Sequence, residues 1–156
     1  MDNYELEVVY NKLSDIQKLE IMTMWVSNQA VPLDVAQQRV NHVVCVIKHV
    51  ATNKIVGVST ALVKQLPYNQ SLYYFYGMFI APEHRGRTIP HRQPWIVATT
   101  VETLRRQNNR IKGVIAVLEN QRIPDRLLLK QGFKQTNKLN INNRVFYLNF
   151  DGSELE

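Results

Sequence analysis

The order of apolar segments along this chain predicts a mixed α/β domain built on one central sheet. Three strand-like segments follow one another between residues 43 and 80, a helical segment comes next, and another apolar strand follows it. Consecutive strands with short polar turns favour antiparallel pairing, whereas a strand–helix–strand unit favours a parallel pair. A length of 156 residues fits one domain, so we expect residues 1–156 to form a single unit.

The first third of the chain predicts one strand and two helices. Residues 4–13 alternate weakly between polar and apolar side chains, which is typical of a strand. Ser14 and Gln17 have the spacing of a capping box, so a helix is expected from Ser14. A shorter helix is expected from residue 32 or 33 to about residue 42. The apolar residues at helical spacing are Ile16, Leu19, Met22 and Val26 in the first helix, and Leu33, Ala36 and Val40 in the second.

The middle of the chain has the pattern of an antiparallel meander. Residues 43–50 and 55–63 flank a polar connection of hairpin length, and residues 71–80 form a third strand-like run. Gly77 lies inside that third run. A glycine there marks a bulge or a close backbone approach, or it is simply tolerated, and these alternatives remain open.

The last third predicts a crossover helix, a buried strand, a short helix and a terminal hairpin. Pro94 suits the start of a helix whose apolar stripe is Val97, Val101 and Leu104. Residues 114–118 are apolar without alternation, which is typical of a strand covered on both faces. Residues 124–131 form a helix ended by Gly132. Residues 133–139 and 145–150 make the hairpin, and residues 151–156 are expected to fray. The predicted order is β-α-α-β-β-β-α-β-α-β-β.

Composition and charge narrow the possible functions. Apolar residues make up 45% and charged residues 21%, as in ordinary globular domains. The single cysteine, Cys45, lies in an apolar run and is expected to be a small core residue. The acidic N-terminus lacks the pattern of a signal peptide and no apolar run could span a bilayer, so we expect a cytoplasmic protein without a membrane partner. The net charge of +6 favours an anionic partner.

The positive charge is concentrated in one loop. An aromatic strand-like run from residue 73 ends at Pro82 and opens into a loop with Arg85, Gly86 and Arg87. No acidic residue occurs between Glu83 and Glu102. A strand that leads through a basic loop into a helix is suited to hold phosphate, because the first N–H groups of the helix are unpaired and its dipole favours negative charge.

This loop and the element order resemble the GNAT superfamily of acyl-CoA-dependent N-acetyltransferases. The family signature is a strand ending in Pro followed by Arg/Gln-x-x-Gly-x-Gly/Ala, and Arg85 takes its first place. Asn120 and the pair Gly132-Phe133 are similar to further family features. The resemblance implies a GNAT-like mixed sheet and transfer of an acetyl group from acetyl-CoA, as co-substrate, to an amine.

Three residues depart from the family pattern. Thr88 and Pro90 stand where the signature has its later glycines, and proline removes one backbone donor from a phosphate-binding loop. Leu128 stands where many members have a tyrosine that protonates the departing thiolate. The alternative is therefore a catalytically silent GNAT-like binding or structural protein.

The resemblance also implies which residues form the site. The expected catalytic residues are Tyr76, Glu83 and Glu119, with His84 as a further possible base. The acceptor is a small-molecule amine or a protein amine, the chain is a monomer or homodimer, and nucleic acid is not the expected partner. No metal site is expected, because the histidines lack further ligands at metal-site spacing. The expected cofactor-binding residues are Met78, Phe79, Ile80, Arg85, Gly86, Arg87, Thr88, Ile89 and Asn120.

Overall fold

The computed structural model describes residues 3–67, 69–85, 93–107, 110–119, 123–139 and 141–155. Its strands form one seven-stranded sheet in the order β1-β2-β3-β4-β5-β7-β6, with β4 and β5 parallel and the other neighbours antiparallel. This confirms the predicted mixed sheet and element order, to which two short 3-10 helices, η1 and η2, are added. The elements are β1 (Tyr4–Val8), α1 (Asp15–Ser27), α2 (Leu33–Arg39), η1 (Val40–His42), β2 (Val43–His49), β3 (Lys54–Gln65), β4 (Leu72–Ile80), η2 (Pro82–His84), α3 (Gln93–Arg105), β5 (Gly113–Leu118), α4 (Asp125–Leu129), β6 (Lys134–Thr136) and β7 (Arg144–Asn149).

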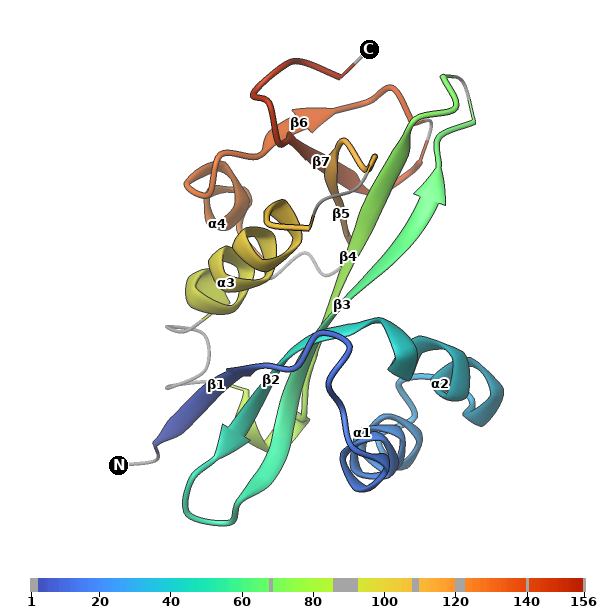
Figure 1. The fold of residues 1–156 in the computed structure, drawn as a ribbon. Helices are drawn as coiled ribbons and strands as arrows, with labels where there is room; N and C mark the ends of the chain where they lie inside the picture. Colours follow the sequence, from blue (N-terminus) through green and yellow to red (C-terminus); the bar gives the residue numbers. More distant parts are fainter. Residues whose placement is uncertain are drawn as a thin grey trace.

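The helices cover both faces of the sheet. Figure 1 shows α1 and α2 on one side and α3 and α4 on the other. The predicted stripe of α3 is confirmed, since Val97, Val101 and Leu104 are buried against the sheet. On the face of the sheet that α1 and α2 cover, but at the end away from these helices, a separate apolar cluster forms around Tyr73, Ile115 and Leu155. None of the helices that the described residues form is long and apolar enough to cross a membrane.

The buried face of α1 differs from the predicted one. Ile16 and Leu19 are 80% and 63% exposed, whereas Ile21 and Trp25 are 0% and 2% exposed. Leu33 at the start of α2 is exposed as well. The sequence of α1 is apolar on more than one side, so periodicity alone admits two faces. The face with Trp25 removes more apolar area from water, and that face packs on the sheet.

The helix ends that depend on local sequence form as predicted. The N–H of Gln17 donates to Ser14 Oγ at 3.1 Å, and the N–H of Ser14 donates to Gln17 Oε1 at 3.0 Å, which completes the capping box. Gly132 ends α4 with a φ of 95°, a conformation that glycine adopts without strain. Phe133 packs behind it in the core.

The C-terminal segment is held in place, so the prediction that residues 151–156 fray is wrong for those described. The Tyr73 hydroxyl donates to Asn149 Oδ1 at 2.6 Å, and the Asn149 side-chain amide donates to the Ser153 carbonyl at 3.1 Å. Lys138 Nζ donates to the carbonyl of Leu155 at 2.5 Å, and the Leu155 side chain is buried. These contacts join residues far apart in the sequence, so no local pattern announces them.

Candidate functional site

The parallel strands β4 and β5 pair over only part of their length. Their register runs from Tyr73 opposite Gly113 to Tyr76 opposite Ala116, while β4 continues to Ile80 and β5 to Leu118. Beyond the last pair, β4 stays bonded to β3 and β5 to β7. The two strands therefore part at their carboxyl ends, and we call the space between residues 77–80 and 117–118 the strand opening. Crevices at the carboxyl ends of parallel strands are common ligand sites.

The backbone of β4 directs polar groups into the strand opening. The N–H of Ala81 donates to Val56 O, and the N–H of Leu66, which directly follows β3, donates to Ser71 O, both at 2.8 Å. Because hydrogen-bonded and non-bonded pairs alternate along an antiparallel ladder, the odd-numbered residues of β4 bond to β3. The peptide groups of Met78 and Ile80 consequently face the opening.

Of the three predicted strand residues, Met78 directs its N–H and carbonyl into the strand opening, and Ile80 directs its N–H there while its carbonyl accepts from Arg85. The backbone of Phe79 is used in the ladder with β3, where it faces Val58. Phe79 contributes its ring instead, which lies 5.3 Å below the guanidinium of Arg85.

Arg85 is anchored at the end of β4. Its Nε donates to the carbonyl of Ile80 at 2.6 Å, while its guanidinium rests over Phe79 and stays exposed. A guanidinium has five N–H donors, so this anchor leaves others for an anion. The remaining predicted loop residues Gly86, Arg87, Thr88 and Ile89, together with Pro90 and Asn120, lie outside the described residues.

A cluster of aromatic rings next to Arg85 was not predicted. The rings of Tyr4, His49 and His84 lie within 5.8 Å of one another, and the Tyr4 hydroxyl is hydrogen-bonded to Nδ1 of His84 at 3.0 Å. Eighty positions separate Tyr4 from His84, so no short-range pattern reveals the contact. It ties η2, and with it the start of the basic loop, to the edge strand β1.

Tyr76 is the predicted catalytic residue nearest the point where the strands part. Its hydroxyl is buried and has no hydrogen-bond partner among the described residues. Burial, and to a lesser extent the neighbouring Cys45 thiol, raise the pKa of Tyr76 well above its ordinary value. The phenol therefore stays protonated at neutral pH, so it is suited to donate a hydrogen bond and not to act as a base.

The other two candidates are carboxylates at the same end of the sheet. Glu83 lies on η2 after β4, Glu119 directly follows β5, and both side chains are exposed.

Leu128 is buried in the core between the sheet and the helices α3 and α4. Trp25 on α1 is buried in the core between this helix and the sheet, so it does not line a groove.

Gly77 sits where the strands begin to part, and its environment decides between the earlier alternatives. A Cβ added to Gly77 would lie 2.6 Å from Oγ1 of Thr60 on β3. The β3–β4 register runs without a shift, so the glycine does not mark a bulge, and the atom that a Cβ would meet belongs to the Thr60 side chain and not to a backbone.

A buried polar network joins α3 to the sheet beneath the site. The N–H of Cys45 donates to Ser59 Oγ at 3.2 Å, Ser59 Oγ is hydrogen-bonded to Thr100 Oγ1 at 2.7 Å, and Thr100 Oγ1 donates to the carbonyl of Ile96. Cys45 is fully buried, as predicted for a core residue. The network fixes the position of the helix that follows the basic loop.

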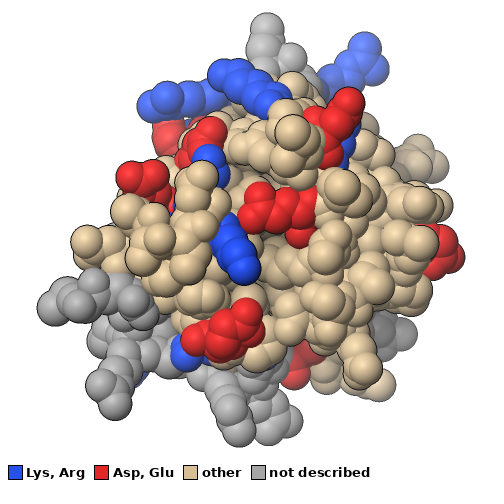
Figure 2. Space-filling view, turned by 90° about the horizontal axis from the view of Figure 1, so that it is seen from below, with Lys and Arg blue, Asp and Glu red and all other residues tan. Residues whose placement is uncertain are grey.

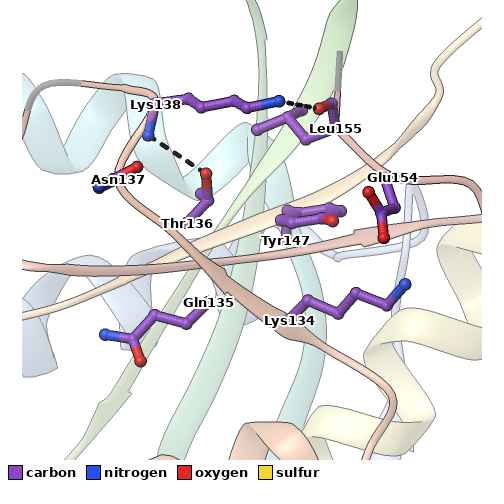
Figure 3. A pocket seen from close by; sticks show the side chains of 8 residues that line it. All are labelled: Lys134, Gln135, Thr136, Asn137, Lys138, Tyr147, Glu154 and Leu155. Carbon is purple, nitrogen blue, oxygen red and sulfur yellow. Dashed lines mark hydrogen bonds between the residues drawn. The ribbon is translucent and has the colours of Figure 1, made fainter.

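Other parts of the described surface have a pocket and a mixed pattern of charges. A pocket of about 640 Å³ lies between β6, β7 and the C-terminal segment, lined by polar side chains around Tyr147 (Figure 3). Acidic and basic side chains are interspersed on the face seen in Figure 2, without a continuous basic area among the described residues there. No group of three potential metal ligands occurs in the part of the chain that the structure describes.

The fold matches that of solved acetyltransferases, including members of the GNAT family, over most of the chain. No protein-family model and no curated protein sequence matches the chain. Among solved structures, it is similar to a ribosomal-protein-S5-alanine acetyltransferase from Vibrio fischeri, with a TM-score of 0.62 and 15% identity over 97% of this chain and 95% of that one. An acetyltransferase of the GNAT family from Streptococcus pneumoniae has a TM-score of 0.62 and 7% identity, over 94% and 99%. A GNAT superfamily phosphinothricin acetyltransferase from Sinorhizobium meliloti, solved with acetyl-CoA, has a TM-score of 0.65 and 11% identity, over 94% and 88%.

Proposed function

We propose that this chain is a divergent GNAT protein that transfers the acetyl group of acetyl-CoA to an amine. The observation that carries the proposal is the strand opening, into which Met78 and Ile80 direct their peptide groups. The amides of a pantetheine arm can pair with such groups as a further strand would. The acetyl-CoA held by the structurally similar enzyme from Sinorhizobium meliloti supports this assignment.

Arg85 is proposed to bind the phosphates of the cofactor. Its guanidinium is oriented by Ile80 and Phe79 at the end of β4, so little side-chain freedom is lost when an anion binds. Bonds from a guanidinium to phosphate are charge-assisted and stronger than neutral ones. Gly86, Arg87, Thr88, Ile89 and Asn120 remain proposed cofactor ligands on the strength of the resemblance.

The proposed reaction is direct attack of a neutral amine on the thioester carbonyl. A C–N bond forms, the C–S bond breaks, and the thiolate of coenzyme A leaves. A backbone N–H that faces the strand opening, such as that of Met78, is placed to stabilise the oxyanion. Glu83 or Glu119 accepts the ammonium proton, directly or through water, and Tyr76 contributes as a neutral donor.

Calorimetric titration with acetyl-CoA tests the binding step. We expect saturable binding that weakens on the order of 10- to 100-fold in Arg85→Ala, because a hydrogen bond to a charged group contributes about 1.5–3 kcal/mol. Arg106→Ala is the matched control, since Arg106 is an exposed arginine at the other end of α3 that pairs with Glu102. No heat and no shift of the thermal unfolding midpoint at millimolar acetyl-CoA would rule the proposal out.

Release of free thiol across a panel of alkylamines, polyamines and peptides tests the chemical step. Turnover that falls in Glu83→Gln or Glu119→Gln, with acetyl-CoA affinity unchanged, identifies the base. Binding of acetyl-CoA without thiol release from any amine would instead favour the catalytically silent alternative.

A further inference from the structure

The segment that joins β4 to the basic loop is a single helical turn. η2 spans only Pro82–His84, and the N–H groups of His84 and Arg85 donate to carbonyls three positions back. One turn of 3-10 helix is marginal by itself, because its hydrogen bonds are poorly aligned and each of them fixes several dihedral angles. Contacts with the rest of the fold must therefore orient η2.

The side chain of His84 makes such a contact. Tyr4 on β1 and His49 on β2 lie directly opposite each other in the β1–β2 register, and both are buried. The centre of the His84 ring lies 5.8 Å from that of Tyr4 and 4.9 Å from that of His49. Nδ1 of His84 is hydrogen-bonded to the Tyr4 hydroxyl at 3.0 Å. We call Tyr4, His49 and His84 the ring cluster.

The two strand members of the ring cluster are themselves held in place. Nδ1 of His49 is hydrogen-bonded at 2.9 Å to Oγ1 of Thr52, in the turn after β2. Tyr4 packs in the apolar core that the sheet forms with α3. His84 therefore docks against a surface that is fixed by the sheet and by its core.

Arg85 directly follows His84, and its side chain turns back towards β4. Its Nε donates to the carbonyl of Ile80 at 2.6 Å, and its guanidinium lies 5.3 Å from the centre of the Phe79 ring. Both contacts require the backbone of Arg85 to leave η2 at the right place. A displacement of η2 by about 1 Å is enough to take the bond to Ile80 outside hydrogen-bond range.

The other end of the basic loop is anchored to the sheet as well. The loop leads into α3, which begins at Gln93, and Thr100 on this helix is hydrogen-bonded to Ser59 on β3 at 2.7 Å. The ring cluster holds the first end of the loop, and Thr100 holds the second. Groups that are fixed before a ligand binds lose less freedom on binding, so this arrangement favours affinity.

We propose that Tyr4 and His84 are positioning residues, which hold Arg85 in place for the phosphates of acetyl-CoA. This role rests on the proposed function, because it takes acetyl-CoA as the ligand. It also gives His84 a part other than that of a base. The imidazole holds η2 through its bond to Tyr4, and it does not accept the proton of the amine.

Calorimetric titration of Tyr4→Phe with acetyl-CoA tests the proposal, because this change keeps the ring and removes only the hydroxyl. We expect the affinity to fall about 3- to 10-fold, the range that corresponds to the loss of one hydrogen bond. Tyr10→Phe is the matched control, since Tyr10 lies shortly after β1 and is partly buried against the same core. It should bind acetyl-CoA as the parent chain does.

A double-mutant cycle with Arg85→Ala separates positioning from general damage to the fold. In the Arg85→Ala background, Tyr4→Phe should weaken binding by less than about 2-fold further, because the guanidinium that it positions is already absent. A general loss of stability would instead weaken binding by the same factor in both backgrounds.

Two variants of His84 distinguish a positioning role from that of a base. Asparagine has an acceptor oxygen where the imidazole has Nδ1, so His84→Asn can keep the bond to Tyr4. It should bind acetyl-CoA more tightly than His84→Ala, whose affinity should fall about 3- to 10-fold or more. If His84 served only as the base, both variants would bind as the parent chain does.

Parent-like affinity in Tyr4→Phe and His84→Ala would overturn this role and leave the proposed function in place. An equal loss on Tyr4→Phe in the parent and Arg85→Ala backgrounds would do the same. A parent chain that does not bind acetyl-CoA would overturn both, so the two failures are distinguishable.

Discussion

Replacing Thr100 by Val should destabilise the protein although the two side chains have the same shape. The change removes the hydroxyl that is hydrogen-bonded to Ser59 at 2.7 Å, at a position where both residues are fully buried. The hydroxyl proton of Ser59 is then left without an acceptor inside the core. A buried polar group left unsatisfied costs about 1–3 kcal/mol, so we expect a loss of about 2 kcal/mol in the free energy of unfolding.

Urea unfolding followed by circular dichroism measures this loss. With a slope of about 1–3 kcal/mol per molar urea, a loss of about 2 kcal/mol moves the midpoint down by roughly 1 M. Thr103→Val is the matched control on the same helix, because Thr103 is only half-buried and donates to the carbonyl of Thr99. Its cost should stay within about 0.5 kcal/mol.

Adding Ser59→Ala tests whether the two hydroxyls act together. The double variant should cost less than the sum of the single changes, because each single change already breaks the shared bond. Equal costs for Thr100→Val and Thr103→Val, or full additivity with Ser59→Ala, would refute the reasoning.

Three further predictions concern other parts of the fold. Ile21→Ala should lower the free energy of unfolding, measured in urea, by about 2–5 kcal/mol, because Ile21 is buried. Leu19→Ala should lower it by less than about 0.5 kcal/mol, because Leu19 is exposed. Similar losses in the two variants would contradict the assigned face of α1. Leu155→Ala should cost about 2 kcal/mol or more if the C-terminal segment is held as described, and a change near zero would contradict it. Because the raised pKa of Tyr76 lets the native state keep a proton that the unfolded chain releases above about pH 10, stability should fall as pH rises beyond that value. In Tyr76→Phe the free energy of unfolding should fall less between about pH 9 and 11 than in the parent chain. The same fall in both proteins would contradict the raised pKa of Tyr76.

The sequence predicted the elements whose signals are local. The capping box at Ser14, the glycine that ends α4 and the meander strands with their short polar turns depend on residues within a few positions of one another, and each forms as expected. Arg85 was placed at the strand end by its motif, and the structure adds the bonds that orient it there.

Tertiary structure decided the features that depend on register and on distant contacts. The apolar residues of α1 would allow either of two faces of the helix to pack on the sheet, and burial of Trp25 selects one of them. The parting of β4 and β5, the outward groups of Met78 and Ile80 and the Tyr4–His84 contact follow from which strands pair and where pairing stops. Local sequence specifies a strand's period of two, but which peptide groups stay free depends on the partners that the folded chain brings beside it.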